Sequence, residues 1–109
     1  MKLPSSLQVG PYTYDVLRVP DLLDADKHSL LGEADYQNLV IRISTVCPDG
    51  KTAGVFMHEL LHAVTDMAGI AVDDPQNHQL AAVLLDTLQR NRLLAPCWEE
   101  NDAKEEVAP

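Results

Sequence analysis

The first half of the chain contains segments in which β-branched and aromatic residues lie between turn-forming residues. Residues 12–19 read Tyr-Thr-Tyr-Asp-Val-Leu-Arg-Val, with Gly10-Pro11 on one side and Pro20 on the other. This composition favours extended backbone, and glycine and proline interrupt regular structure at its ends. Residues 12–19 are therefore predicted to form a strand, and the polar stretch 21–29 that follows is left unassigned.

Two further strand-like segments lie at residues 30–36 and 39–43, and only Gln37-Asn38 separates them. A two-residue connection suits a tight antiparallel hairpin in which Asn38 takes a left-handed conformation. Alternate positions of the second segment are aliphatic, whereas its other face carries Arg42. One face is thus predicted to meet the core while the other is partly open, as in a strand at the edge of a sheet.

The second half of the chain has helical periodicity. From residue 51 or 52 to residue 68 the chain is compatible with one helix, and Gly69 supplies a C-terminal stop. Apolar residues cover most of the circumference of this segment, as expected for a helix packed on more than one side. An acidic cap and a proline at residues 73–75 then mark a second helix, whose apolar residues repeat at helical spacing to about Leu94.

These elements predict a single α+β domain over residues 1–95, in which a small antiparallel sheet of about three strands packs on two long helices. A chain of 109 residues can bury one core and has no room for a second domain. Residues 96–109 are rich in Asp and Glu and offer little to bury after Trp98. We therefore expect an acidic, mobile C-terminal tail.

Composition narrows the range of partners and locations. Lys and Arg number 8 against 17 Asp and Glu, which gives a formal net charge of -9. Because nucleic-acid-binding proteins concentrate positive charge, nucleic acid is disfavoured as a ligand. No apolar stretch approaches the roughly 20 residues of a membrane-spanning helix, and no signal peptide is recognised, so we expect a soluble cytoplasmic protein without a membrane partner. Cys47 and Cys97 are expected to be reduced thiols.

The strongest chemical signal lies at residues 58–62, which read His-Glu-Leu-Leu-His in the middle of the first predicted helix. Histidines four positions apart lie on the same helix face, about 5 to 6 Å apart at Cβ, so both imidazoles can reach one metal ion. Without a metal, burial of these polar groups in an apolar segment would require other partners. The pattern predicts His58 and His62 as zinc ligands, and Glu59 as the general base that passes a proton from water to a leaving amine.

A catalytic zinc site needs a third protein ligand, with water in the fourth position. His78 is the leading candidate because it lies near the start of the second predicted helix, and the loop 69–75 is long enough to turn the chain back toward the histidine pair. Other residues could ligate the metal or orient a histidine. These competing candidates are Asp66, Asp73 and Asp74.

The remaining reactive side chains receive structural interpretations. His28 stands in a polar segment and is expected at the surface, and Cys47 is expected to be buried as a small apolar residue. Tyrosines can donate to a transition-state oxyanion, although strand tyrosines more often serve packing. The tyrosines concerned are Tyr12, Tyr14 and Tyr36.

With these motifs in place, the chain resembles very small zinc metallopeptidases of the zincin kind, in particular short phage- and prophage-encoded proteins related to the ImmA/IrrE immunity-repressor proteases. The resemblance covers residues 12–94. It rests first on a Gly-containing strand that ends in an acidic–aromatic pair, residues 31–36, and on the strand that follows it, residues 39–43. It continues with the motif His-Glu-Leu-Leu-His-Ala at residues 58–63 and with a second helix that ends near Asn91.

The resemblance implies a zinc ion held by two histidines and a glutamate from the first turn of the second helix, a position that alignment of the helices gives to His78. Related enzymes also place an Asp one turn later, where this chain has Ala82, so Asp66 and Asp86 are the candidate substitutes. The resemblance further implies that strand 39–43 forms the sheet edge above the zinc, where an extended polypeptide substrate could add as a strand.

We therefore expect a zinc-dependent metallopeptidase that hydrolyses a protein substrate, encoded by a phage or prophage and acting in the cytoplasm of the bacterial host. The alternative is a non-catalytic binding protein stabilised by zinc on the same scaffold, which the histidine in place of glutamate motivates. A third interpretation, an acidic interaction protein that blocks or mimics a nucleic-acid partner, rests on the net charge of -9 alone.

Overall fold

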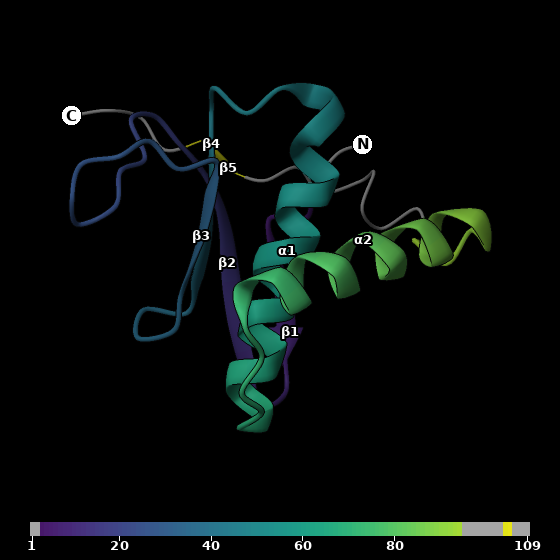
Figure 1. Ribbon diagram of the computed structural model, residues 1–109. Coiled ribbons are helices and arrows are strands. Elements are labelled where there is room, and N and C mark those ends of the chain that lie inside the picture. The colour runs from purple at the N-terminus through teal and green to yellow at the C-terminus, as the bar shows by residue number, and fades with distance from the viewer. Residues whose placement is uncertain (1–2, 95–103, 106–109) are drawn as a thin grey trace.

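A computed structural model describes residues 3–94 and 104–105 of the chain. A mixed β-sheet is covered on one face by α1, and α2 crosses α1 on the side away from the sheet (Figure 1). In chain order the elements are β1 (Ser6–Val9), β2 (Tyr12–Val19), β3 (Gly32–Asp35), β4 (Val40–Ser44), α1 (Asp49–Ala68), α2 (Asp74–Arg90) and β5 (Lys104–Glu105). None of the helices in the described part has the length and apolar character to cross a membrane.

The α+β class and the two long helices are confirmed, whereas the sheet is larger and less regular than expected. Its strand order is β1-β2-β4-β3, with the short β5 paired to β2. Two neighbours are antiparallel, β1 with β2 and β3 with β4, but β2 and β4 run parallel. The expectation of about three strands in an antiparallel sheet is therefore correct only for the predicted hairpin, because the chain crosses over between β2 and β4.

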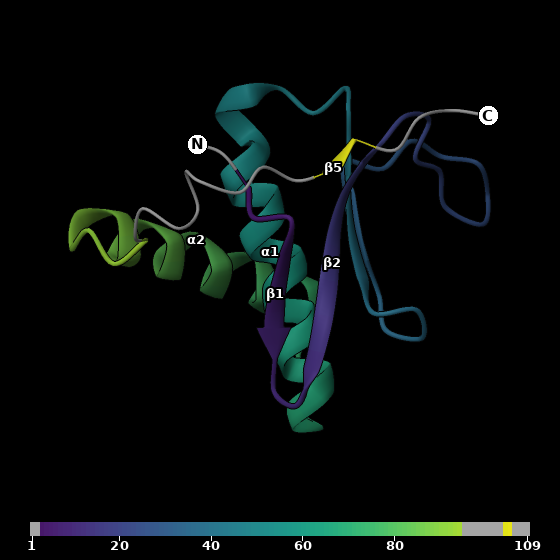
Figure 2. The same cartoon turned by 180° about the vertical axis from the view of Figure 1, so that it is seen from behind.

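Strand β1 was not predicted, although the sequence carries a signal for it. Leu7 and Val9 alternate with polar residues just before Gly10-Pro11, and this pair forms the two-residue turn between Val9 and its partner Tyr12. Gly10 has a φ of 56°, a left-handed conformation that suits glycine. Figure 2 shows β1 beside β2 on the far side of the sheet from the β3–β4 hairpin.

The prediction that residues 39–43 form an edge strand is wrong. β4 lies between β2 and β3, and β3 is the terminal strand of the sheet. Val40 and Ile41, which point to opposite faces, are both buried. Arg42 suggested an open face, but it forms ion pairs with Glu33 and Asp35 of the neighbouring strand at 2.9 and 3.0 Å.

The hairpin loop is longer than expected, since Asp35 pairs with Val40 and four residues connect the strands. The left-handed conformation predicted for Asn38 is found instead at Leu39, whose φ is 56°. The Asp35 carboxylate holds this loop by accepting hydrogen bonds from the backbone N–H groups of Gln37 and Asn38 at 3.1 and 3.0 Å. One side chain thus supports the turn that ends the edge strand.

Helix α1 begins at Asp49, two to three residues before the predicted start, and ends as predicted, with Gly69 at φ 70°. It packs against β1, β3 and β4 as well as α2. The core between α1 and the sheet includes Phe56 and Ala63 from the helix, and Val16 and Ile41 from the strands, all at 0% exposure. This packing explains why apolar residues surround most of α1.

Helix α2 ends at Arg90, a turn before the predicted end, and among the described elements it contacts only α1. Its buried residues are Asn77 and Ala81, while Leu80 and Val83 remain 53% and 67% exposed. The predicted tail, residues 96–109, lies outside the described residues except for β5, so its expected mobility remains a prediction.

Asp35 provides a pH-dependent test of the hairpin. Hydrogen bonds from Asn38 and the nearby Arg42 lower its pKa from 3.8 to about 2. A lowered folded-state pKa stabilises the fold above the unfolded pKa, and this contribution disappears as the pH falls from about 4 to about 2. We expect Asp35→Ala to lower the free energy of unfolding at pH 7 by about 1 kcal/mol, a value discounted for solvent screening, and to flatten its pH dependence below pH 4.

Urea denaturation at a series of pH values measures this effect. The exposed Asp26 in the loop before β3 serves as the control, and Asp26→Ala should leave the acid limb of the curve unchanged. An Asp35→Ala curve parallel to that of the native protein would contradict the assigned role.

Candidate metal centre

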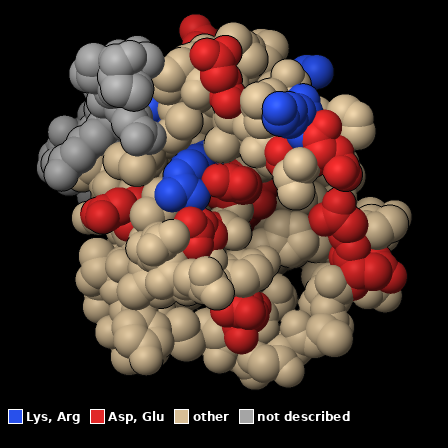
Figure 3. Space-filling model, turned by 90° about the vertical axis from the view of Figure 1, so that its left-hand side faces the viewer, with Lys and Arg blue, Asp and Glu red and all other residues tan. Residues whose placement is uncertain are grey.

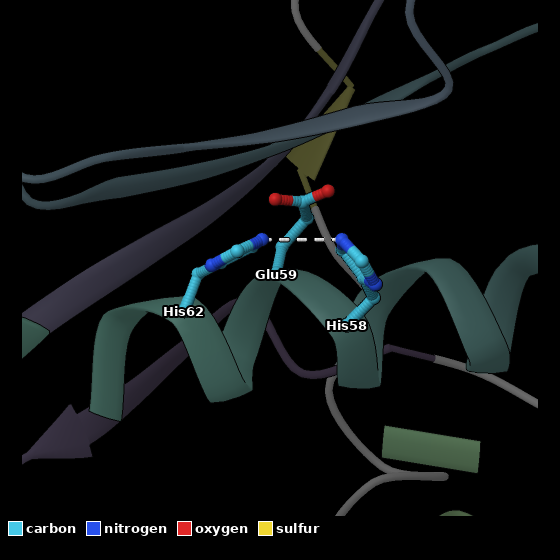
Figure 4. Close-up of side chains that lie close together, drawn as sticks. All are labelled: His58, Glu59 and His62. Atoms are coloured by element: carbon cyan, nitrogen blue, oxygen red, sulfur yellow. Dashed lines mark hydrogen bonds between the residues drawn. The ribbon is translucent and has the colours of Figure 1, made fainter. Parts of the chain in front are cut away.

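The His-Glu-x-x-His segment occupies the middle of α1, at the point where the helix passes beneath the edge strand β3. Helical spacing places His58 and His62 on one face, and Figure 4 shows their imidazoles facing each other with the Glu59 carboxylate standing beside them on the sheet side. The two Nε2 atoms are 3.2 Å apart. One ligand atom from each of the three residues lies within 4.8 Å of the others.

The acidic residue that completes this group comes from the first turn of α2. Asp74 Oδ1 lies 3.0 Å from His62 Nε2 and 3.5 Å from His58 Nε2. Asp73 is the N-cap of α2, and its carboxylate accepts a hydrogen bond from the Gln76 backbone at 2.7 Å. This cap fixes where α2 begins and leaves Asp74 as its first residue, free to face the histidine pair.

The donor set fits a zinc ion. Three atoms that can each offer a lone pair converge at separations of 3.0, 3.2 and 3.5 Å. Donors bound tetrahedrally to one zinc ion at about 2.0 to 2.1 Å lie roughly 3.3 to 3.4 Å from one another. Hydrogen bonds can join these atoms in pairs when a ring nitrogen carries a proton, whereas one divalent cation would bind all three at once.

His78, the leading sequence candidate for the third ligand, lies one helical turn after Asp74. Both residues are exposed, and 77% of the Asp74 side chain is accessible to solvent. Its ring centroid is 5.8 Å from that of His58, with the two rings tilted by 57°. Of the competing candidates, only Asp74 contacts the histidines directly. Asp66 makes no hydrogen bond to either histidine, Asp73 caps α2, and Asp86 pairs with Arg90 at 2.8 Å.

Glu59 is held in a largely desolvated position. It keeps 9% of its surface exposed, and burial is the main cause that raises its pKa to about 7, with the negative charges of Asp74 and Glu33 adding to the effect. A carboxyl group with a pKa near neutrality can both accept and release a proton at physiological pH. Burial and the neighbouring His62 lower the pKa of His58, which favours the neutral imidazole that binds metals.

A cavity of about 390 Å³ opens beside these residues and is bounded on its other side by β3. Its wall includes His58, Glu59, His62 and Asp74, together with Tyr36 at the end of the edge strand. Apolar side chains from both walls complete it, namely Leu30, Leu31, Ala34 and Val55. The candidate centre is therefore open to a ligand that lies along β3.

No match to this chain was found among protein-family models, curated proteins or solved structures. The assignment of a function therefore depends on the geometry of this centre and on the sequence motifs.

Acidic side chains dominate the surroundings of the cavity. Glu33, Glu59 and Asp74 line it, and the Glu33 carboxylate is paired with Arg42 at 2.9 Å. Figure 3 shows Asp and Glu side chains spread over the face on which the β3–β4 hairpin lies, while Lys and Arg gather at a few points.

The other reactive residues lie outside the centre, with the exception of Tyr36. Tyr14 is buried in the core at 1% exposure, Tyr12 is half exposed, and Cys47 is a buried thiol. His28 is exposed and lies close to Asp24 and Asp26, as a surface position predicts. Asp24 accepts backbone hydrogen bonds from Asp26 and His28 at 2.8 and 2.9 Å, which accounts for the cluster as a turn.

Gly32 permits the close approach of β3 to the candidate base. A Cβ at this position would lie 2.7 Å from Val55 Cγ1 and 3.1 Å from Glu59 Cγ. We expect Gly32→Ala to lower the free energy of unfolding by about 1 to 3 kcal/mol, because β3 must move away from α1. Thermal or urea denaturation of the metal-free protein measures the change.

Gly54 supplies a matched control on the exposed face of α1, where an added Cβ has no neighbour within 4 Å. Gly54→Ala should stabilise the protein by about 0.5 to 1 kcal/mol through helix propensity. Equal effects of the two substitutions would show that the contact at Gly32 is not tight.

Proposed function

We propose that this protein is a zinc-dependent metallopeptidase with a minimal zincin-like core. The observation that carries the proposal is the convergence of His58 Nε2, His62 Nε2 and Asp74 Oδ1 at 3.0 to 3.5 Å, next to the buried carboxylate of Glu59. The proposed ligands are His58, His62 and Asp74. His78, which the sequence favoured, lies beside these residues, with its ring centroid 5.8 Å from that of His58.

Each residue has a defined task in this proposal. When bound, zinc supplies a Lewis acid that polarises a substrate carbonyl and lowers the pKa of water. Glu59 accepts a proton from the attacking water and delivers it to the leaving amine. The apolar wall of the cavity lowers the local dielectric constant, which strengthens these electrostatic interactions.

An extended polypeptide is the proposed substrate. β3 is the terminal strand on the hairpin side of the sheet, so its outer backbone groups are available for pairing, and the cavity with Glu59 lies directly beside it. A peptide that adds to this edge as a strand would run past the candidate base.

The resemblance to phage- and prophage-encoded relatives of the ImmA/IrrE proteases supports a role in the cytoplasm of a bacterial host. It is compatible with the motif at residues 58–62 and with an acidic residue in the first turn of α2. In this proposal Asp74 performs the task that glutamate has in those enzymes.

A non-catalytic protein with a structural zinc ion is the second candidate, and the position of His78 favours it. With a ring centroid 5.8 Å from that of His58, a rotation of the His78 side chain could add a fourth protein ligand. Four protein ligands close a zinc site to substrate, whereas three leave one position open. The two functions therefore differ in whether His78 binds the metal.

Zinc content distinguishes the ligand sets. After dialysis against metal-free buffer, elemental analysis should find about one zinc ion per native chain and much less in His58→Ala, His62→Ala and Asp74→Ala. His78→Ala should retain its zinc, since an open site does not use it. Loss from His78→Ala with retention in Asp74→Ala would restore His78 as the third ligand, and loss from both would indicate the closed, structural site.

Catalysis is tested with Glu59→Gln, which keeps the shape of the side chain but removes the base. We expect zinc to remain bound and hydrolysis to fall by about 100-fold or more, as measured on casein and on paired peptide libraries with basic or acidic residues around the cleaved bond. Asp66→Asn, the same charge change in an exposed residue of α1, is the control and should stay active. Full activity in Glu59→Gln would rule out the proposed mechanism.

A further inference from the structure

A buried amide joins the two helices directly beneath the candidate metal centre. Asn77 of α2 is 0% exposed, and its Nδ2 donates a hydrogen bond to the backbone carbonyl of His58 at 3.0 Å. That carbonyl can accept a second donor because it has two lone pairs, one of which serves the regular helix bond. The contact therefore ties the residue that presents the first histidine to the first turns of α2.

The position of Asn77 along α2 links this contact to Asp74. Residues three and four apart share a helix face, so Asp74, Asn77 and Ala81 form one stripe toward α1. Asn77 and Ala81 are the buried residues of α2 in the described part of the chain, and α2 contacts no other described element. The orientation of Asp74 toward the histidines thus depends on how this stripe sits on α1.

Packing alone does not explain an asparagine at this site. Asn77 Oδ1 is buried without a hydrogen-bond partner among the described residues, which costs free energy that an apolar side chain of the same size would not incur. A directional hydrogen bond, by contrast, fixes both the rotation and the translation of α2 at one point. A buried polar group retained at such a cost is consistent with a positional role.

We propose that Asn77 is a positioning residue for the metal centre: through its hydrogen bond to the His58 carbonyl it sets α2 on α1 so that the Asp74 carboxylate meets the two imidazoles. The inference rests on the proposed zinc site. It assigns Asn77 no contact with the metal or with a substrate, and its consequence is a preorganised third ligand.

The decisive variant is Asn77→Leu, which removes the hydrogen bond and the unpaired acceptor together. Zinc affinity is measured by competition with a chromophoric chelator, with Zn²⁺ alone as the ligand, and the stability of the metal-free protein by urea denaturation. We expect stability to be unchanged or higher and zinc affinity to fall by about 10-fold or more, as for other residues that orient metal ligands. If Asn77 had only a structural role, the Asn77→Leu variant would lose both stability and zinc affinity, or neither.

Two further variants keep the test decisive if leucine disturbs the fold. Asn77→Ala should also weaken zinc binding by about 10-fold, whereas Ala81→Gly, which loosens the same interface without touching the hydrogen bond, should change it by less than about 3-fold. In an Asp74→Ala background, Asn77→Ala should weaken zinc binding no further, because the two residues act through one ligand.

The outcomes separate this inference from the function on which it rests. A native protein that binds no zinc overturns the proposed metal site and the role of Asn77 with it. A native protein that binds zinc, together with an Asn77→Leu variant of equal affinity, overturns the positioning role alone. If Ala81→Gly and Asn77→Ala weakened zinc binding equally, general packing between the helices, and not the hydrogen bond of Asn77, would set the geometry of the centre, and the proposal would be wrong.

Discussion

The crossing of α1 and α2 is the contact on which the candidate centre depends. Helix α1 supplies His58, Glu59 and His62, but the carboxylate beside them belongs to α2, which contacts no other described element. Since α2 buries only a narrow stripe, a small rotation about its axis would carry Asp74 away from the imidazoles. The geometry of the candidate centre thus depends on this one helix–helix interface, in which the hydrogen bond of Asn77 lies one turn from Asp74.

A second close contact gives the centre its other wall. β3 passes over α1 at Gly32 so closely that no side chain fits between them, and this places the terminal strand of the sheet beside Glu59. The outer face of the same strand is held by the ion pairs of Arg42, and the loop that follows it is held by the Asp35 carboxylate. The edge strand, the buried Glu59 carboxylate and a convergent set of donor atoms therefore meet in one cavity.

The chemistry of the centre follows from the crowding of lone pairs. Two imidazole nitrogens and a carboxylate oxygen at 3.0 to 3.5 Å repel one another unless a cation or protons lie between them. In a metallopeptidase the ion leaves one position for the reaction, while in a structural site a fourth side chain fills that position. Whether His78, one turn after Asp74, binds the metal therefore distinguishes a structural site from a catalytic one.

Local patterns in the sequence determined the elements and the central motif. Helix periodicity alone places two histidines four residues apart on one face, Gly69 ends α1, and the cap at Asp73 starts α2. Local patterns do not specify which distant segments pair with each other. The parallel pairing of β2 with β4 and the position of β3 at the edge of the sheet were therefore visible only in the tertiary structure. The acidic neighbour of the histidine pair also emerged only in the tertiary structure. Asp74 and His78 share one face of α2, and the point at which α2 crosses α1 decides which of them contacts the two histidines.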